Sequence, residues 1–281
     1  FLLMPTLQSR DNVRLAVVGL GSIGTDVVNA VRSGHVNGID LVAAAEPAAC
    51  HTRDELLAAN IPVYEHVQDF PWSQLDVVLE ATSQSVLRKI APQVVREGVD
   101  LVILSAGATL DIEFLPALLE LADQTGSKIW FPSGALGALD VVRAASVGDI
   151  EAITLTTTKH PSALANAPHI ENSKIDLDSI SSRQEVFAGG PAAAVRGFPQ
   201  NVNVAALLSL AAGNPDQVHV RVIADPNAPG NVHEVEVRGS FGNMAIRIEN
   251  EPSPTNPKTS ALAAQSVVAL LRQLGSAQRF G

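Results

Sequence analysis

A glycine motif near the start of the chain limits its fold more than any other segment does. Residues 19–24 read Gly-Leu-Gly-Ser-Ile-Gly, follow an apolar run that begins at Val13, and precede a helical pattern that extends to Arg32. In this order the first glycine permits a tight turn, the second lets backbone approach a pyrophosphate, and the third lets the helix pack closely on the strand. We expect a dinucleotide to bind here, with a purely structural tight turn as the alternative. The predicted binding residues are Gly19, Gly21, Ser22, Ile23 and Gly24.

An acidic residue follows the second predicted strand. The apolar segment 41–45 ends at Glu46, which lies 22 residues after Gly24. An acidic side chain at about this spacing binds the adenosine ribose 2′-hydroxyl of NAD and repels the 2′-phosphate of NADP. Thr52 and Arg53 follow closely and offer groups that bind such a phosphate, so NAD is favoured and NADP remains an alternative. For Glu46 the structural alternative is a solvated loop carboxylate.

Apolar segments and helical patterns then alternate. Strands and helices are predicted, in turn, at residues 75–80, 86–97, 100–104, 113–125 and 128–131. This alternation predicts an α/β fold with a Rossmann-type doubly wound parallel sheet, and we assign residues 11–131 to a dinucleotide-binding domain. Ligands of such sheets lie beyond the carboxyl ends of the strands, although small residues are ordinary in turns. The turn residues expected to line a cofactor cleft are Ala81, Thr82, Ser105, Ala106 and Gly107.

The periodicity changes in the second half of the chain, where we predict an α+β domain over residues 132–255 with a mainly antiparallel sheet. Residues 160–183 show no sustained period, which is typical of a long functional loop. Alternating apolar residues then predict a meander of three consecutive strands. These strands are 217–224, 232–238 and 244–249. The last segment, 256–281, contains a helical pattern and is expected to return to the first domain.

One histidine stands out as a candidate for proton transfer. His233 lies near the start of a predicted strand and shares the parity of the apolar residues Val235 and Val237. A buried imidazole needs a polar partner, so the pattern fits either a catalytic acid/base or a satisfied core histidine. The sequence contains no G-x-S-x-G elbow, no phosphate loop and no H-E-x-x-H pair that would indicate another catalytic scheme.

The overall composition excludes several classes of function. Nineteen Lys and Arg residues against twenty-nine Asp and Glu residues give a net charge of −10, which disfavours binding to nucleic acids. No apolar run is long enough to predict a membrane span. A single cysteine, Cys50, cannot form an internal disulfide or a thiol-rich metal site, so we expect a cytoplasmic protein without a bound metal. A valine-rich sheet face that we expect to be exposed suggests a homodimer.

Several short motifs occur in a fixed order along the chain. Besides the glycine motif they are Pro132 to Asp140 (PSGALGALD), Phe198 to Ala205 (FPQNVNVA), Ala224 to Pro226 (ADP), Asn231 to Glu234 (NVHE) and Asn256 to Ser260 (NPKTS). In this combination the chain resembles the L-aspartate dehydrogenase family over residues 13–271. The ordered set of motifs is far more specific than the glycine motif alone.

The resemblance implies a fold similar to homoserine dehydrogenase and an NAD(P)-dependent oxidation of L-aspartate to iminoaspartate. Iminoaspartate hydrolyses to oxaloacetate and ammonia or feeds NAD biosynthesis. His233 matches the family's active-site histidine, which would activate water or move a proton at the imine. Ala135 and Asn203 match residues that contact the cofactor near its nicotinamide.

A dicarboxylate substrate requires cations or amides in the site, although the chain is acidic overall. Our candidates are Lys159, Asn201 and Lys258, each of which has an ordinary surface or capping role as its alternative. The family usually has lysine at the position of Gln200, so a different amino or hydroxy acid is an alternative substrate. A protein that senses the dinucleotide without catalysis is a third reading, which the presence of both Asn203 and His233 disfavours.

Overall fold

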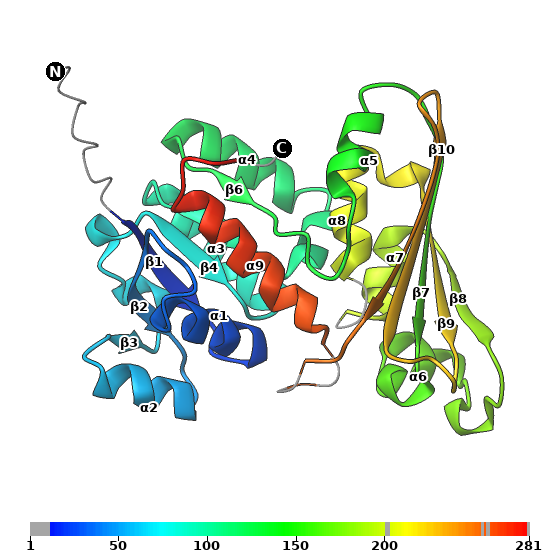
Figure 1. The fold of residues 1–281 in the computed structure, drawn as a ribbon, viewed down its shortest axis with the longest axis horizontal. Coiled ribbons are helices and arrows are strands. Elements are labelled where there is room, and N and C mark those ends of the chain that lie inside the picture. The colour runs from blue at the N-terminus through cyan, green and yellow to red at the C-terminus, as the bar shows by residue number, and fades with distance from the viewer. Residues whose placement is uncertain (1–11, 200–202, 254–255, 257–258, 280–281) are drawn as a thin grey trace, which may run out of the picture.

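The computed structural model describes residues 12–199, 203–253, 256 and 259–279, which form two lobes built on separate sheets (Figure 1). Between the lobes the chain runs through residues 131–138, and it re-enters the first lobe after residues 259–260, which precede α9. No helix within these described ranges is long and apolar enough to cross a membrane.

The first sheet confirms the predicted Rossmann-type fold. Its strand order is β3-β2-β1-β4-β5-β6, and every pair in it is parallel. The strands are β1 (Val13–Val18), β2 (Ile39–Ala45), β3 (Val63–Tyr64), β4 (Val77–Glu80), β5 (Asp100–Ile103) and β6 (Ile129–Trp130). The chain reverses direction across the sheet between β1 and β4, which is where such folds bind dinucleotides.

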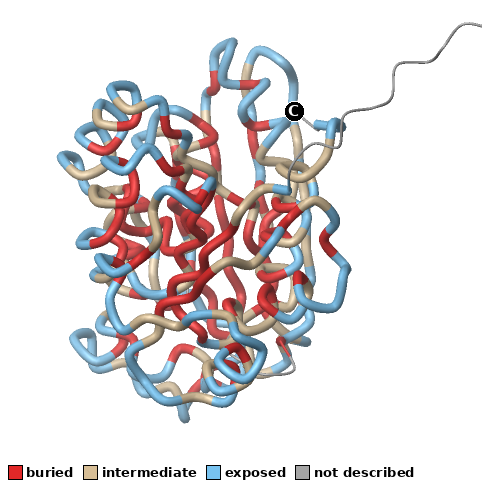
Figure 2. Tube along the Cα trace, turned by 90° about the vertical axis from the view of Figure 1, so that its left-hand side faces the viewer, coloured by how far each residue is buried: buried red, intermediate tan, exposed pale blue. Residues whose placement is uncertain are grey.

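Helices cover both faces of this sheet, so its central strands are buried on both sides (Figure 2). Apolar side chains of α3 and α4 pack on one face, and those of α1 and α9 pack on the other. This two-sided burial explains why the strands read as continuous apolar runs rather than as alternating patterns. The helices are α1 (Ser22–Arg32), α2 (His51–Ala58), α3 (Gln84–Arg96), α4 (Phe114–Thr125) and α9 (Ala261–Leu274).

The second sheet is mainly antiparallel, as predicted, but the predicted meander is wrong. Its strand order is β11-β10-β7-β9-β8, with β7 and β9 parallel and the other pairs antiparallel. Strand β7 therefore separates β9 from β10, although β9 and β10 follow each other in the sequence. The strands are β7 (Ile150–Lys159), β8 (Gln184–Gly189), β9 (Val218–Ala224), β10 (Asn231–Gly239) and β11 (Gly242–Asn250).

Two segments of this lobe differ from the sequence analysis. Strand β8 was not predicted, because this edge strand buries Val186 while Glu185 and Ala188 stay exposed, which leaves only a weak alternating pattern. The expected long loop at residues 160–183 contains a short helix, α6 (Pro168–Ser173), and two 3-10 turns.

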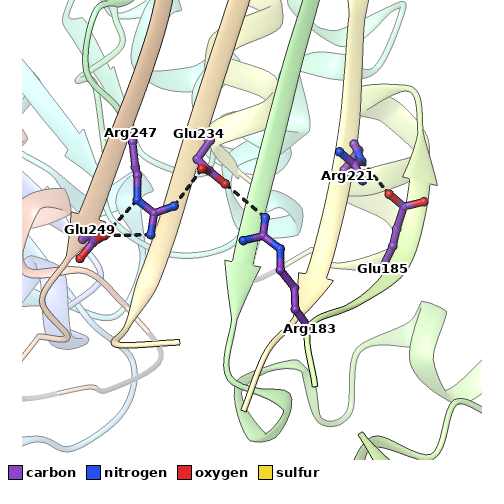
Figure 3. A network of polar contacts seen from close by, with 6 residues as sticks. All are labelled: Arg183, Glu185, Arg221, Glu234, Arg247 and Glu249. Atoms are coloured by element: carbon purple, nitrogen blue, oxygen red, sulfur yellow. Dashed lines mark hydrogen bonds and ion pairs between the residues drawn. The ribbon is translucent and has the colours of Figure 1, made fainter. Parts of the chain in front are cut away.

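The faces of the second sheet also differ from expectation. Its valines do not form an exposed face, because they are buried against α5 (Leu139–Ala145), α7 (Pro191–Gly197) and α8 (Asn203–Ala212). The outer face instead carries paired charges (Figure 3). Arg247 bridges Glu234 and Glu249, and Arg221 pairs with Glu185 across the β8–β9 ladder.

Helix α9 lies against α1 and belongs to the first lobe (Figure 1). Val267 and Leu271 are fully buried among the residues of β1, α1 and β4. Arg272 donates from Nε to the carbonyl oxygen of His35 at 2.8 Å. In the first half of the helix, Ser266 Oγ accepts a hydrogen bond of 3.0 Å from the Gly134 N–H, which joins α9 to the segment that enters the second lobe.

Candidate active site

A cleft with a volume of about 720 Å³ brings together residues from both lobes. The first lobe contributes the glycine loop and the turns after β4 and β5, and the second lobe contributes the end of β7, the start of β10 and the start of α8. The predicted site residues that line this cleft are Gly21, Ser22, Ile23, Ala81, Thr82, Ser105, Ala135, Lys159, Asn203 and His233. The two halves of the chain therefore meet at one candidate site.

The glycine loop has the geometry that its sequence predicted. Gly19 has φ +92°, and a Cβ there would lie 2.5 Å from the Ala81 carbonyl oxygen. A Cβ on Gly24 would collide with the Gly19 carbonyl oxygen. Gly21, by contrast, faces open space just before α1, where it provides no side chain to cap the helix. These features fit a pyrophosphate bound to the loop and the start of the helix.

Glu46 lies directly after β2 and touches the glycine loop. Its carboxylate accepts hydrogen bonds from the backbone N–H groups of Leu20 at 2.9 Å and Ala48 at 3.0 Å. Arg53 donates to the carbonyl oxygen of Glu46 at 2.8 Å, and the hydroxyl of Thr52 lies 2.9 Å from that of Thr25. Both residues that we considered for a 2′-phosphate thus have partners within the protein.

The sequence analysis missed Glu80, which is fully buried at the end of β4. Its carboxylate accepts hydrogen bonds from the backbone N–H groups and the hydroxyl groups of Thr82 and Ser105, at distances between 2.6 and 3.0 Å. Glu80 thereby joins the turns after β4 and β5, both of which line the cleft. The available signal was an acidic residue that ends an apolar strand, with Thr and Ser in the two turns that follow.

Five predicted site residues are described but do not line the cleft: Gly19, Gly24, Glu46, Ala106 and Gly107. Ala106 is fully buried in the 3-10 turn after β5, and the N–H of Gly107 donates to Oδ1 of Asn203 at 3.2 Å. This contact joins the first lobe to the start of α8. On the opposite side of the cleft, Ala135 is held by a hydrogen bond of 3.2 Å from Nδ2 of Asn250 to its carbonyl oxygen.

His233 occupies the inner face of β10, directly opposite Thr157 of β7. The side chain of His233 is buried, and its Nδ1 lies 3.0 Å from the hydroxyl oxygen of Thr157. Burial, and then the nearby positive charge of Lys159, lower the pKa of His233 to about 3. The imidazole is therefore neutral at neutral pH, and no described residue forms a hydrogen bond with its Nε2.

Lys159 is the buried cation of the cleft. It lies at the end of β7, is 3 % exposed, and burial lowers the pKa of its ammonium group to about 8. Within the described part of the chain, no carboxylate forms an ion pair with it. A buried charge without a counterion is costly, so this position is suited to an anionic ligand.

Three residues named in the sequence analysis, Gln200, Asn201 and Lys258, lie outside the described residues. Among the residues that are described, no group of three His, Cys, Asp or Glu side chains has an arrangement that would hold a metal ion.

Two parts of the sequence match known family models, and the boundary between the two matched parts lies near residue 135. Residues 19–132 match the NAD-binding domain of homoserine dehydrogenase, and residues 140–274 match the C-terminal domain of aspartate dehydrogenase. The L-aspartate dehydrogenase of Methanosarcina barkeri is 38% identical over 96% of this chain and 99% of its own length. The enzyme of the same name from Nitrosopumilus maritimus is 36% identical over 92% of this chain and 96% of its own length.

Solved structures share the fold. The aspartate dehydrogenase of Thermotoga maritima aligns with a TM-score of 0.77 at 24% identity, over 96% of this chain and 100% of that one. An amine dehydrogenase from Mycobacterium smegmatis aligns with a TM-score of 0.60 at 12% identity, over 94% of this chain and 93% of that one. At these identities the likeness concerns the arrangement of the two lobes.

Proposed function

The chain belongs to the L-aspartate dehydrogenase family, and from this premise we propose that it oxidises L-aspartate to iminoaspartate with a nicotinamide dinucleotide. The observation that carries the proposal is the meeting of a buried neutral His233 and a buried unpaired Lys159 with the glycine loop in one cleft. The cleft thus combines a dinucleotide site, a site for a carboxylate and a group that exchanges protons.

We assign the binding of the dinucleotide to the first lobe. When bound, it supplies the acceptor for the hydride that leaves the substrate carbon. The glycine loop and the start of α1 would hold its pyrophosphate, and Glu46 would accept a hydrogen bond from the adenosine ribose. The turns after β4 and β5, together with Ala135 and Asn203, would contact the nicotinamide half.

We further propose that the cofactor is NAD rather than NADP. The negative charge of Glu46 would repel a 2′-phosphate, and Arg53 already donates to the Glu46 and Pro47 carbonyl oxygens. A 2′-phosphate would therefore meet the negative charge of Glu46, while one nitrogen of the Arg53 guanidinium is already engaged by backbone carbonyl oxygens.

Lys159 is proposed to bind a carboxylate of the substrate. Its ammonium group is buried in the cleft and lacks an ion-pair partner among the described residues, so a carboxylate would neutralise a charge that is otherwise costly. Asn201 and Lys258 remain candidates for the remaining contacts on the basis of the sequence alone.

His233 is proposed as the group that moves protons. Thr157 engages Nδ1, which leaves Nε2 to exchange a proton with the substrate amine or with the water that attacks the imine. A neutral imidazole is in the form that can accept a proton from a reacting group, which an imidazolium is not. Hydrolysis of iminoaspartate would then give oxaloacetate and ammonia.

Initial rates of NADH and NADPH formation across a panel of amino and hydroxy acids at alkaline pH test the assignment. We expect L-aspartate with NAD to give the highest kcat/KM. Turnover of another acid without turnover of L-aspartate would disprove the substrate, and binding of NADH without turnover of any acid would indicate a sensor.

Two broader predictions accompany the reaction. We propose a homodimer that uses the outer face of the second sheet, since alternating Arg and Glu side chains suit a self-complementary contact (Figure 3). Sedimentation velocity of the protein and of Arg247→Glu would test this interface, and a monomeric wild type would disprove it.

We also infer a reducing compartment such as the cytoplasm, since the sequence contains one cysteine.

A further inference from the structure

Glu80 places a negative charge under the floor of the cleft. The side chain is fully buried, and within the described ranges no basic side chain forms an ion pair with it. Two backbone N–H groups and two hydroxyl groups donate to its carboxylate instead. A buried charge is tolerated when hydrogen bonds replace its hydration, and four donors match the acceptor sites of a carboxylate.

The carboxylate is also held in a fixed position relative to the cleft. Its donors belong to Thr82 and Ser105, and both of these residues line the cleft. One Oε atom accepts from three of the four donors, and the other accepts from the Ser105 N–H at 3.0 Å. The charge therefore lies one hydrogen bond below the surface that a ligand would touch.

The topology indicates which part of a dinucleotide lies above Glu80. A Rossmann-type sheet has two halves, each of which binds one mononucleotide. Glu46 follows β2 and marks the half that takes the adenosine, so the half that contains β4 and β5 takes the nicotinamide. The nicotinamide ring carries a positive charge when oxidised and none when reduced.

We propose that Glu80 makes the cleft prefer the oxidised, cationic nicotinamide over the reduced, neutral one. The proposal rests on the proposed dinucleotide site. Lys159 brings a positive charge to the same cleft, so without Glu80 the cationic ring would meet an unopposed ammonium group. Glu80 is thus a positioning residue that acts on the cofactor through its charge and through the two turns that it joins.

The test compares the dissociation constants of NAD⁺ and NADH for the wild type and for Glu80→Gln, measured by calorimetry and by NADH fluorescence. A buried unit charge acting across several ångströms of protein changes a binding constant by about tenfold. We expect Glu80→Gln to weaken the binding of NAD⁺ by about this factor relative to the binding of NADH. The amide nitrogen of the new side chain would face the Ser105 N–H, so both constants also rise together by a smaller amount.

Glu80→Asp is the matched control, because it keeps the charge but shortens the side chain and breaks the contacts with the turns. We expect Glu80→Asp to weaken the binding of both nucleotides and to leave the ratio of their affinities near that of the wild type. Should Glu80→Gln not fold, Glu80→Ser removes the same charge and leaves room for a water between Thr82 and Ser105.

An unchanged ratio of the two constants in the charge-removing variant would overturn the proposal and leave Glu80 as a structural brace. A ratio that shifts equally in Glu80→Asp would also overturn it. Failure of the wild type to bind either nucleotide would contradict the proposed function itself, which is a separate outcome.

Discussion

Thr157 and His233 face each other across the β7–β10 ladder, with the threonine hydroxyl 3.0 Å from Nδ1 of the imidazole. Both side chains are buried, and neither strand is at an edge of the sheet. The pair therefore fixes the ring orientation on a rigid element and leaves Nε2 as the ring nitrogen for the proton transfer that we propose.

Replacement of the imidazole should abolish most of the turnover. Because general acid–base groups typically contribute about 10² to 10⁴ in rate, we expect His233→Ala to lower kcat by a factor in that range. The glycine loop and Glu46 are unaffected, so the Kd of NADH should change little. Stopped-flow rates and NADH fluorescence titration measure the two quantities, and loss of NADH binding would assign His233 a structural role.

Removal of the orienting hydroxyl should have a smaller effect of the same kind. Thr157→Val keeps the shape but removes the partner of Nδ1, and the loss of one buried hydrogen bond corresponds to about a tenfold fall in kcat. Thr154→Val is the control, since Thr154 lies on the opposite face of the same strand. Equal effects of the two substitutions would contradict an orienting role for Thr157.

Binding of an acid without an amine should depend on pH through Lys159. Burial lowers the pKa of its ammonium group to about 8, so the group is charged below this pH and loses its charge above it. The Kd of succinate in the presence of NADH should rise as the pH increases beyond about 8. Calorimetry across pH 6–10 should show this rise in the wild type and a weak, pH-independent binding of succinate in Lys159→Met. The same pH profile in both proteins would exclude Lys159 as the residue that binds the carboxylate.

Removal of the carboxylate after β2 should relax the choice of cofactor. Glu46→Ala eliminates the repulsion of a 2′-phosphate, and we expect the ratio of kcat/KM for NADP over NAD to rise about tenfold. The Leu20 N–H loses its acceptor, so kcat/KM with NAD should fall as well. Glu65→Ala serves as the comparison, because Glu65 also lies close to Arg53 but does not contact the glycine loop. An unchanged ratio in Glu46→Ala would remove Glu46 from the adenosine pocket.

The C-terminal helix should be essential for the stability of the first lobe. Leu271 is fully buried against α1 and the first sheet, so Leu271→Ala should lower the free energy of unfolding by about 2–5 kcal/mol. The exposed substitution Gln265→Ala on the same helix should change it by less than about 0.5 kcal/mol. Urea denaturation followed by circular dichroism measures both, and equal small effects would show that α9 is loosely attached.

Local sequence patterns were enough to predict much of the candidate site. The spacing of Gly19, Gly21 and Gly24 predicted a turn and a close approach of the backbone, and the structure has that geometry, with the Ala81 carbonyl oxygen next to Gly19. The inward orientation of His233 could also be predicted, because side chains alternate between the two faces of a strand. His233 is buried together with Val235 and Val237, which lie on the same face.

Contacts between segments that are distant in the sequence could not be predicted from it. The sequence contains no signal that inserts β7 between β9 and β10, because strand periodicity gives the face of each residue but not its neighbouring strand. Glu80 escaped notice for the same reason, since its role depends on Ser105, which lies 25 residues away in the turn after the neighbouring strand β5. A carboxylate at the end of a strand otherwise indicates exposure to solvent.

Helix α9 completes one face of the first sheet, although the chain has passed through the entire second lobe before reaching it. The second lobe is therefore an insertion into the first and is tethered at both ends, through residues 131–138 and through the segment that precedes Ala261. A fragment that ends before α9 would leave Val267 and Leu271 missing from an otherwise closed core. The face of the first sheet that α9 covers is therefore completed only by residues that follow the second lobe in the sequence.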